Sequence, residues 1–397
     1  MIKILFLGAS WGQISPIWHL QDDIDIEILT ADNQPLNPGH ALAKSSFNIS
    51  SENTELLRSV VEKHHIDYVL CFASDVGQKS QAIISKELGN FYNPIEAIEI
   101  LTNKYLFRDF LNQESIQKTY FKKIIESDLG DISILKSIRN NLPLVSKPIL
   151  GSGSKGVRFI FKTKDLKNIK DSFAYSDSII LESYIEKEGK QICGDGFFQS
   201  GKLVNFTAGD GLFYEHNQFQ IPYAESFPST HSDKIINEAK TKIEKILNLS
   251  GFVRGNINFD VIIHDGEVYI LEVAPRPGGN FIPEIIKQHS GIDLIDAFIK
   301  NSIDESYIFS QKKITNNFVS SFMIHSLEEG VLGEILIDKQ LDPYIVQKHF
   351  FYKPGDEVKI FKSGSDAIGN IQFLFPSQSI QSEIMKSIND LILIKLK

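Results

Sequence analysis

Residues 256–280 read NINFDVIIHDGEVYILEVAPRPGGN, and this stretch predicts a β-hairpin. Two apolar runs rich in β-branched residues, Phe259–Ile263 and Val268–Val273, flank the polar segment His264–Glu267. An Asp-Gly turn between two such runs is a strong local signal for a pair of antiparallel strands. The hairpin therefore brings side chains from both runs to one place.

Each strand of this hairpin carries one acid within its apolar run, Asp260 in the first and Glu272 in the second. Carboxylates on neighbouring strands can point at one spot, and carboxylate oxygens hold Mg²⁺, which also binds phosphate. Two ordinary surface acids are the alternative, but an unpaired charge in an apolar run is unfavourable. We therefore predict a metal site. Arg276 follows Glu272 by four residues and offers a planar fork for a phosphate or a carboxylate.

A second cluster lies upstream, where the apolar strand Leu144–Leu150 carries a single lysine, Lys147. The strand runs into the Gly/Ser loop 151–156, and Arg158–Phe161 then resumes a strand. Backbone N–H groups of such a flap can surround phosphate oxygens. The loop is not a Walker A motif, because it contains no Gly-Lys-Ser/Thr and no helix follows. A plain hairpin turn is the alternative, but a lysine in an apolar strand predicts a partner anion.

Taken in order, these pieces resemble the ATP-grasp superfamily over most of the chain, and in particular its L-amino-acid ligases and other carboxylate–amine ligases. The resemblance implies ATP and Mg²⁺, or Mn²⁺, as cofactors. It assigns the metal to Asp260 and Glu272 and catalytic roles to Arg276 and Lys147. The nucleotide-binding residues that it implies are Lys104, Lys147, Ser152, Gly153, Ser154, Gly156, Glu182, Tyr184, Ile185 and Glu188.

Two positions depart from the family pattern. The ribose-binding Glu expected seven residues after Glu182 is Gly189, so we expect Glu188 to take this role or the contact to be lost. The third metal ligand, often Asn, is replaced by Ala274. The Gly-Asp-Gly motif at residues 194–196 is shared with the amino-acid ligases.

The fold class expected is α/β. A doubly wound parallel N-terminal domain (1–100) precedes a two-lobed ATP-grasp, with a linker helix and small lobe (101–181) and a large lobe (182–305). A small C-terminal α/β unit (306–397) completes it. Strands at Ile2–Leu7, Ile24–Leu29 and Tyr68–Phe72 alternate with a helix at Thr54–His64, which predicts the parallel N-terminal sheet.

Three further segments carry predictions. The turn at Gly8 lacks the third glycine of a dinucleotide loop, and Ser10, Trp11 and Gln13 beside it are candidates for the substrate site. Residues 210–230 are polar and aromatic without clear periodicity, which favours a long loop. His216, Tyr223 and Glu225 in this segment are candidates for substrate contacts, with ordinary surface residues as the alternative. Residues 377–394 are expected to form a closing helix.

Composition agrees with a multidomain enzyme. A chain of 397 residues is too long for one ordinary core. The net charge of −9 argues against a nucleic-acid partner, which needs a basic face. Two cysteines, Cys71 and Cys193, imply neither a disulfide framework nor a zinc site. We expect a cytoplasmic protein without a signal peptide or a membrane span.

The resemblance implies an ADP-forming ligase that joins a small-molecule carboxylate to an amine through an acyl phosphate, with an amino acid or small peptide as substrate. A homodimer is a family-based expectation. One alternative is a carboxylase or formyl-transferring enzyme of nucleotide metabolism, suggested by Pro275-Arg276-Pro277. Another is a non-catalytic ATP-binding module, suggested by Gly189 and Ala274.

Overall fold

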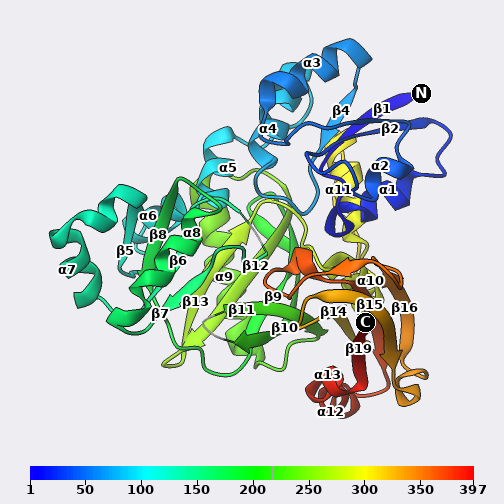
Figure 1. Cartoon of the computed structure of the whole chain (residues 1–397). Coiled ribbons are helices and arrows are strands. Elements are labelled where there is room, and N and C mark those ends of the chain that lie inside the picture. Colours follow the sequence, from blue (N-terminus) through cyan, green and yellow to red (C-terminus); the bar gives the residue numbers. More distant parts are fainter. Residues whose placement is uncertain (152, 217–218) are drawn as a thin grey trace.

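The computed structural model describes residues 1–151, 153–216 and 219–397 (Figure 1). Strands of this part of the chain form four sheets, of four, four, eight and three strands. In Figure 1 the N-terminal sheet and the small lobe lie on different sides of the large sheet, and the C-terminal elements pack below the N-terminal sheet. The expected class, a parallel α/β domain followed by a two-lobed mixed fold, is confirmed.

The N-terminal sheet is parallel throughout, with the order β3-β2-β1-β4. Helix α3 has the predicted limits because the Asn53 side chain accepts a hydrogen bond from the Leu56 N–H at its start and His65 ends it in the left-handed conformation. The elements are β1 (Ile2–Leu7), β2 (Ile26–Ala31), β3 (Ser45–Phe47), β4 (Tyr68–Leu70), α1 (Ser15–Leu20), α2 (Gly39–Leu42), α3 (Thr54–His64) and α4 (Gln78–Leu88).

The two faces of the N-terminal sheet have different neighbours. Leu5 and Leu7 of β1 point to one side and pack under α3 and α4. The alternate residue Phe6 points to the other side, into an apolar cluster that includes Phe298 of helix α11 (Leu294–Ile303), which lies far along the chain. This apolar contact fixes the N-terminal sheet on the rest of the molecule, so residues at the ends of its strands keep a defined position.

The small lobe is a four-stranded antiparallel sheet with the order β5-β8-β6-β7. The segment between β7 and β8 forms a 3₁₀ helix, η3, followed by one short α-helical turn, α8. The elements of this lobe and its linker are α5 (Ile95–Thr102), α6 (Lys104–Gln113), β5 (Phe121–Ile125), η2 (Glu126–Gly130), α7 (Ile132–Asn140), β6 (Leu144–Pro148), β7 (Arg158–Ile160), η3 (Thr163–Ile169), α8 (Lys170–Phe173) and β8 (Ser178–Ser183).

The large sheet has the order β13-β12-β9-β10-β11-β14-β18-β16. Helix α9 covers one face, because Ile243 and Leu247 recur at helical spacing and pack on the apolar side of β12 and β13. The elements from this lobe are β9 (Gln191–Gln199), β10 (Lys202–His216), β11 (Phe219–Phe227), α9 (Asp233–Ser250), β12 (Gly255–His264), β13 (Glu267–Ala274), α10 (Ile282–Ser290) and α11.

The expectation of a long loop over residues 210–230 is wrong. Most of this segment belongs to β10 and β11, which pair antiparallel from Asp210 opposite Ser226 onward. The two-residue period is obscured by a bulge between Leu212 and Phe213 and by the mixed glycine, polar and apolar residues that line the cavity. Glu225 therefore lies on a strand in the sheet, and the His216 side chain falls outside the described side chains.

The C-terminal residues extend the large sheet, since β14 pairs with β11. The single helix expected at residues 377–394 is also wrong, because it gives way to strand β19, which pairs with β15. These elements are β14 (Phe318–Ile324), β15 (Gly330–Ile337), η4 (Lys339–Leu341), β16 (Ile345–Phe350), β17 (Glu357–Val358), η5 (Gly364–Asp366), β18 (Gly369–Phe375), α12 (Gln378–Lys386), α13 (Ile388–Leu391) and β19 (Ile392–Leu396). Among the described residues, none of the helices is both long and apolar enough to span a bilayer.

Candidate active site

A cavity of about 1270 Å³ lies between the small lobe, the large sheet and the N-terminal sheet, and C-terminal residues also contribute to its lining. One face of the large sheet forms its floor. The lysines and the flap of the small lobe lie on one side, and the loops that follow β1, β2 and β4 lie on another. The strand ends of the N-terminal sheet therefore open into the same space as the predicted nucleotide residues.

The two predicted metal ligands lie together on the floor. Asp260 of β12 and Glu272 of β13 are direct partners in the antiparallel register, and both line the cavity. Gln191 Nε2 donates to Asp260 Oδ1 at 2.7 Å. Burial, and after it the charge of Glu272, raises the pKa of Asp260 to about 6. A divalent cation between the two carboxylates would remove this repulsion, so the pair fits a Mg²⁺ site.

Both predicted phosphate lysines also line the cavity. Asn103 caps helix α6, and this cap places Lys104 in the first helical position, where its Nζ donates to the Gly151 carbonyl at 2.6 Å. Lys147 extends from β6 and its Nζ lies 2.5 Å from Glu182 Oε1. The two ammonium groups are thus held at the base of the flap and at the hinge strand β8.

Glu182 does not lie free to meet an adenine ring, because it forms a buried network with two cations. Arg108 Nε donates to Glu182 Oε2 at 2.5 Å, and Lys147 holds the other oxygen. Burial alone would raise the pKa of Glu182, but the charges of Arg108 and Lys147 outweigh it and lower this pKa to about 2. Sequence reasoning missed Arg108, although a basic residue on the buried face of α6 was a usable signal.

The flap has the backbone that its glycines permit. Gly153 and Gly156 have φ of 69° and 71°, and Ser154 shares this left-handed conformation. Gly153 and Ser154 line the cavity, whereas a Cβ on Gly156 would lie 2.8 Å from Pro148 and Tyr175 atoms. Gly156 is therefore required for close packing at the end of the flap. Ser152 lies outside the described residues.

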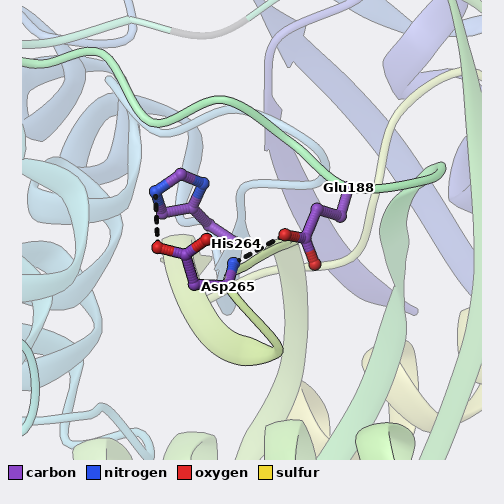
Figure 2. Close-up of side chains that lie close together, drawn as sticks. All are labelled: Glu188, His264 and Asp265. Carbon is purple, nitrogen blue, oxygen red and sulfur yellow. Dashed lines mark hydrogen bonds and ion pairs between the residues drawn. The ribbon is translucent and has the colours of Figure 1, made fainter.

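The hinge residues separate into two groups. Tyr184 and Ile185 line the cavity, as an adenine-binding hinge requires. Glu188, predicted for ribose, lies outside this lining, and Figure 2 shows it beside the turn of the β12–β13 hairpin. Its carboxylate accepts hydrogen bonds from the backbone N–H groups of Asp265 at 2.8 Å and Gly266 at 3.2 Å. Glu188 stabilises this turn, and the structure does not bring it to the nucleotide side.

Arg276 lines the cavity but its fork is already engaged. Its Nε and one terminal nitrogen bind Asp75 at 2.8 and 3.0 Å, and its other terminal nitrogen donates to Asn258 at 3.2 Å. Asp75 lies in the N-terminal domain, in the loop after β4, and was not predicted. The side chain expected to hold an acyl phosphate therefore also joins the N-terminal domain to the large sheet.

The Gly-Asp-Gly motif has a positional role. Asp195 of β9 is fully buried and accepts from the Gly278 N–H at 2.9 Å and from Asn258 Nδ2 at 2.9 Å. Burial raises the pKa of Asp195 to about 7. A Cβ on Gly278 would lie 2.9 Å from atoms of Asn258 and Asp195. Asp195 thus holds the loop that carries Arg276.

The part of the cavity lined by N-terminal and C-terminal residues and by Glu225 is its far end, and this part is aromatic and acidic. Ser10, Trp11 and Gln13 line it, as predicted from their place after β1, and Trp11 stacks on Phe351 with ring centres 4.6 Å apart. Glu225 of β11 also lines the cavity although only 3% of it is exposed. Among the lining residues outside positions 101–280, the charged side chains are Asp32, Glu52 and Asp356, with no lysine or arginine.

Most of the predicted site residues lie in a segment that matches a known protein family. Residues 101–280 match the family model described as ATP-grasp domain. A formate-dependent phosphoribosylglycinamide formyltransferase of Prochlorococcus marinus (strain MIT 9515) is 24% identical over 299 residues, which cover 72% of this chain and 73% of that protein. All of the predicted site residues from Lys104 to Arg276 lie within the matched family segment.

Two crystal structures share the whole fold. An L-amino acid ligase from Bacillus licheniformis superposes with a TM-score of 0.81 at 16% identity, covering 100% of this chain and 99% of that one. A phosphoribosylglycinamide synthetase from Anaerococcus prevotii gives a TM-score of 0.75 at 23% identity, with both chains covered completely. At these identities the likeness establishes the common fold.

Proposed function

Because the chain belongs to the ATP-grasp proteins through residues 101–280, we propose that it is an ADP-forming ligase that joins a carboxylate to an amine through an acyl phosphate. The observation that carries the proposal is the composition of one cavity. It holds two lysines beside a glycine-rich flap and, on its floor, two carboxylates in direct register. These are the groups that phosphoryl transfer from ATP requires, since it depends on positioning and charge neutralisation.

The chain's own residues have separable tasks in this proposal. Lys104 and Lys147 neutralise phosphate oxygens, and N–H groups around Gly153 and Ser154 enclose them. Asp260 and Glu272 would hold Mg²⁺, which when bound polarises the phosphate oxygens for attack by the substrate carboxylate. Closure of the flap would exclude water from the acyl phosphate. Asp75 and Asn258 hold the Arg276 guanidinium group in a fixed orientation beside this site. In this proposal Arg276 supplies a positive charge at a fixed position.

The curated relatives favour one carboxylate. The relative from Prochlorococcus marinus is named a formate-dependent phosphoribosylglycinamide formyltransferase. This supports the formyl-transferring alternative of nucleotide metabolism over the amino-acid ligase. Transfer of activated formate to an amine is also a carboxylate–amine ligation. A formyltransferase and an amino-acid ligase would therefore use the same lysines and carboxylates.

A second candidate, an amino-acid or peptide ligase, is supported by the charge of the far end of the cavity. A phosphoribosyl amine brings a phosphate, which proteins hold with arginine, lysine or N–H groups. The described lining outside residues 101–280 instead offers Asp32, Glu52 and Asp356 with no lysine or arginine. This distribution suits an amine without a phosphate.

The test is product analysis with Mg²⁺-ATP, offering formate and a panel of amino acids as carboxylates and amino acids or glycinamide ribonucleotide as amines. We expect ADP and phosphate only when a carboxylate and an amine are both present. AMP as product would contradict the proposal. Glu267→Gln is the matched control for Glu272→Gln, because Glu267 is an exposed acid on the same strand. Turnover should survive in the control and be lost in the variant.

A further inference from the structure

Glu225 is a buried carboxyl group with one oxygen unused. Only 3% of the residue is exposed, yet it lines the cavity. Its Oε1 accepts a hydrogen bond from Asn280 Nδ2 at 3.2 Å. Its Oε2 is buried and has no hydrogen-bond partner among the described residues. Because leaving a buried acceptor unsatisfied costs about 1–3 kcal/mol, a donor from a ligand is expected at this oxygen.

The register of the large sheet fixes where Glu225 lies relative to the predicted metal ligands. Glu225 of β11 pairs with Gly211 of β10, Gly211 pairs with Gln191 of β9, and Gln191 binds Asp260. All of them line the cavity. Three strand spacings separate β12 from β11, roughly 14 Å between backbones. The Phe213 ring lies over Gly211, where a Cβ would be 2.8 Å from its Cε2, so this part of the cavity lining is aromatic.

Among the other buried charged groups of the site, Asp195 accepts hydrogen bonds on both oxygens and Asp260 faces Glu272 and accepts from Gln191. Two further groups receive a counter-charge from the protein. Glu182 has Arg108 and Lys147, and Arg276 has Asp75. Glu225 has no ion pair with any described residue, and only the amide of Asn280 contacts its carboxylate. Burial raises the pKa of Glu225 to about 8, with the charge of Asp260 adding to the effect. A substrate ammonium group beside Glu225 would lower this pKa again, because an opposite charge favours the ionised form, and would leave the carboxylate able to accept a proton.

We propose that Glu225 binds the ammonium group of the acyl-accepting amine and removes its proton before the attack. This inference rests on the proposed function, since it needs an acyl phosphate as the electrophile. The R–NH₃⁺ group gives one proton to Oε2 of Glu225. The nitrogen lone pair then forms the bond to the carbonyl carbon, and the C–O bond to phosphate breaks. The second nitrogen proton leaves with the phosphate, and Glu225 returns its proton to solvent.

The test separates activation of the carboxylate from attack by the amine. Hydroxylamine is a weakly basic nucleophile that is already neutral near neutral pH, so its attack on an acyl phosphate does not require a base. We expect Glu225→Gln to keep hydroxamate formation, while amide formation with an ordinary amine falls about 10²–10⁴-fold, the usual contribution of a general base. Glu334→Gln, an exposed acid on β15, should leave both reactions unchanged.

The outcomes are distinguishable. If the wild-type protein forms no hydroxamate with any carboxylate, the proposed function fails before Glu225 is tested. If Glu225→Gln loses hydroxamate and amide formation alike, or retains both, the role of Glu225 is overturned. Glu225→Asp adds a second readout, because a shortened base should raise KM for the amine and lower kcat for the amide while hydroxamate formation persists.

Discussion

The nucleotide end and the far end of the cavity compensate their buried charges in different ways. At the nucleotide end, Glu182 sits between Arg108 and Lys147, and Arg276 is held by Asp75. At the far end, Glu225 is equally buried but meets only the amide of Asn280. The comparison teaches that burial alone does not identify a binding group. A buried charged group whose polar atoms are occupied by the protein positions its neighbours, whereas one with an unused oxygen is available to a substrate.

The largest effect is expected at the metal carboxylates. Replacing Glu272 by Ala removes half of the predicted Mg²⁺ site, and several kcal/mol of transition-state stabilisation depend on such an ion. ADP release should fall about 10³-fold or more. Steady-state ADP release at saturating Mg²⁺ measures this, with Glu267→Ala as the control. Full activity in Glu272→Ala would show that the acid pair is not the metal site.

At the nucleotide end, we expect replacement of Glu182 to lower the stability of the protein. Glu182→Gln leaves Arg108 and Lys147 buried without a counter-charge, and breaking a buried pair in this way costs about 3–5 kcal/mol. The free energy of unfolding from urea titration should fall by this amount. Under the same conditions Glu225→Gln should be neutral or stabilising, because it removes a carboxylate that has no cation. Equal destabilisation by both variants would show that the two ends of the cavity do not differ in how their buried charges are compensated.

The same pair has a signature in acid. The pKa of Glu182 is about 2 in the folded protein, against the ordinary value of 4.5, so its contribution to stability is complete above pH 4.5. This contribution is lost as the pH falls from 4.5 toward 2. The difference in free energy of unfolding between wild type and Glu182→Gln should therefore shrink over this range. A pH-independent difference would show that Glu182 is not ionically bound.

The smallest effect is expected at Glu188. Its carboxylate accepts two backbone hydrogen bonds at the hairpin turn, outside the cavity (Figure 2). Glu188→Gln should cost roughly 0.5–1.5 kcal/mol of stability and leave the Kd for ATP unchanged. Isothermal titration with ATP and thermal unfolding measure the two quantities. A large loss of ATP affinity would restore Glu188 to the ribose site that its place after the hinge suggested.

Local patterns predicted a large part of this molecule. Apolar β-branched runs around an Asp-Gly turn located the hairpin with Asp260 opposite Glu272, and the helix predicted at Thr54–His64 has these limits in the structure. What escaped prediction depends on pairing across the chain. The partners Arg108 and Glu182 are 74 residues apart, and Asp75 and Arg276 are 201 residues apart. No local pattern records which distant charge will meet which.

The errors in secondary structure have the same origin. β11 is a strand because it pairs with both β10 and β14, although its polar residues suggested a loop. β19 replaces the end of an expected helix because β15 offers it an unpaired edge. In both cases tertiary pairing overrides weak local preference. Glu225 was consequently expected on a loop, and its strand position became visible only in the folded chain.

The most direct test of the account follows an oxygen atom. The reaction is run with the substrate carboxylate labelled with oxygen-18, and the released phosphate is analysed by mass spectrometry. The account predicts that each phosphate carries one labelled oxygen, because the carboxylate oxygen stays on phosphorus when the amine attacks the carbonyl carbon. Unlabelled phosphate released together with the amide product would contradict an acyl phosphate and with it the central proposal.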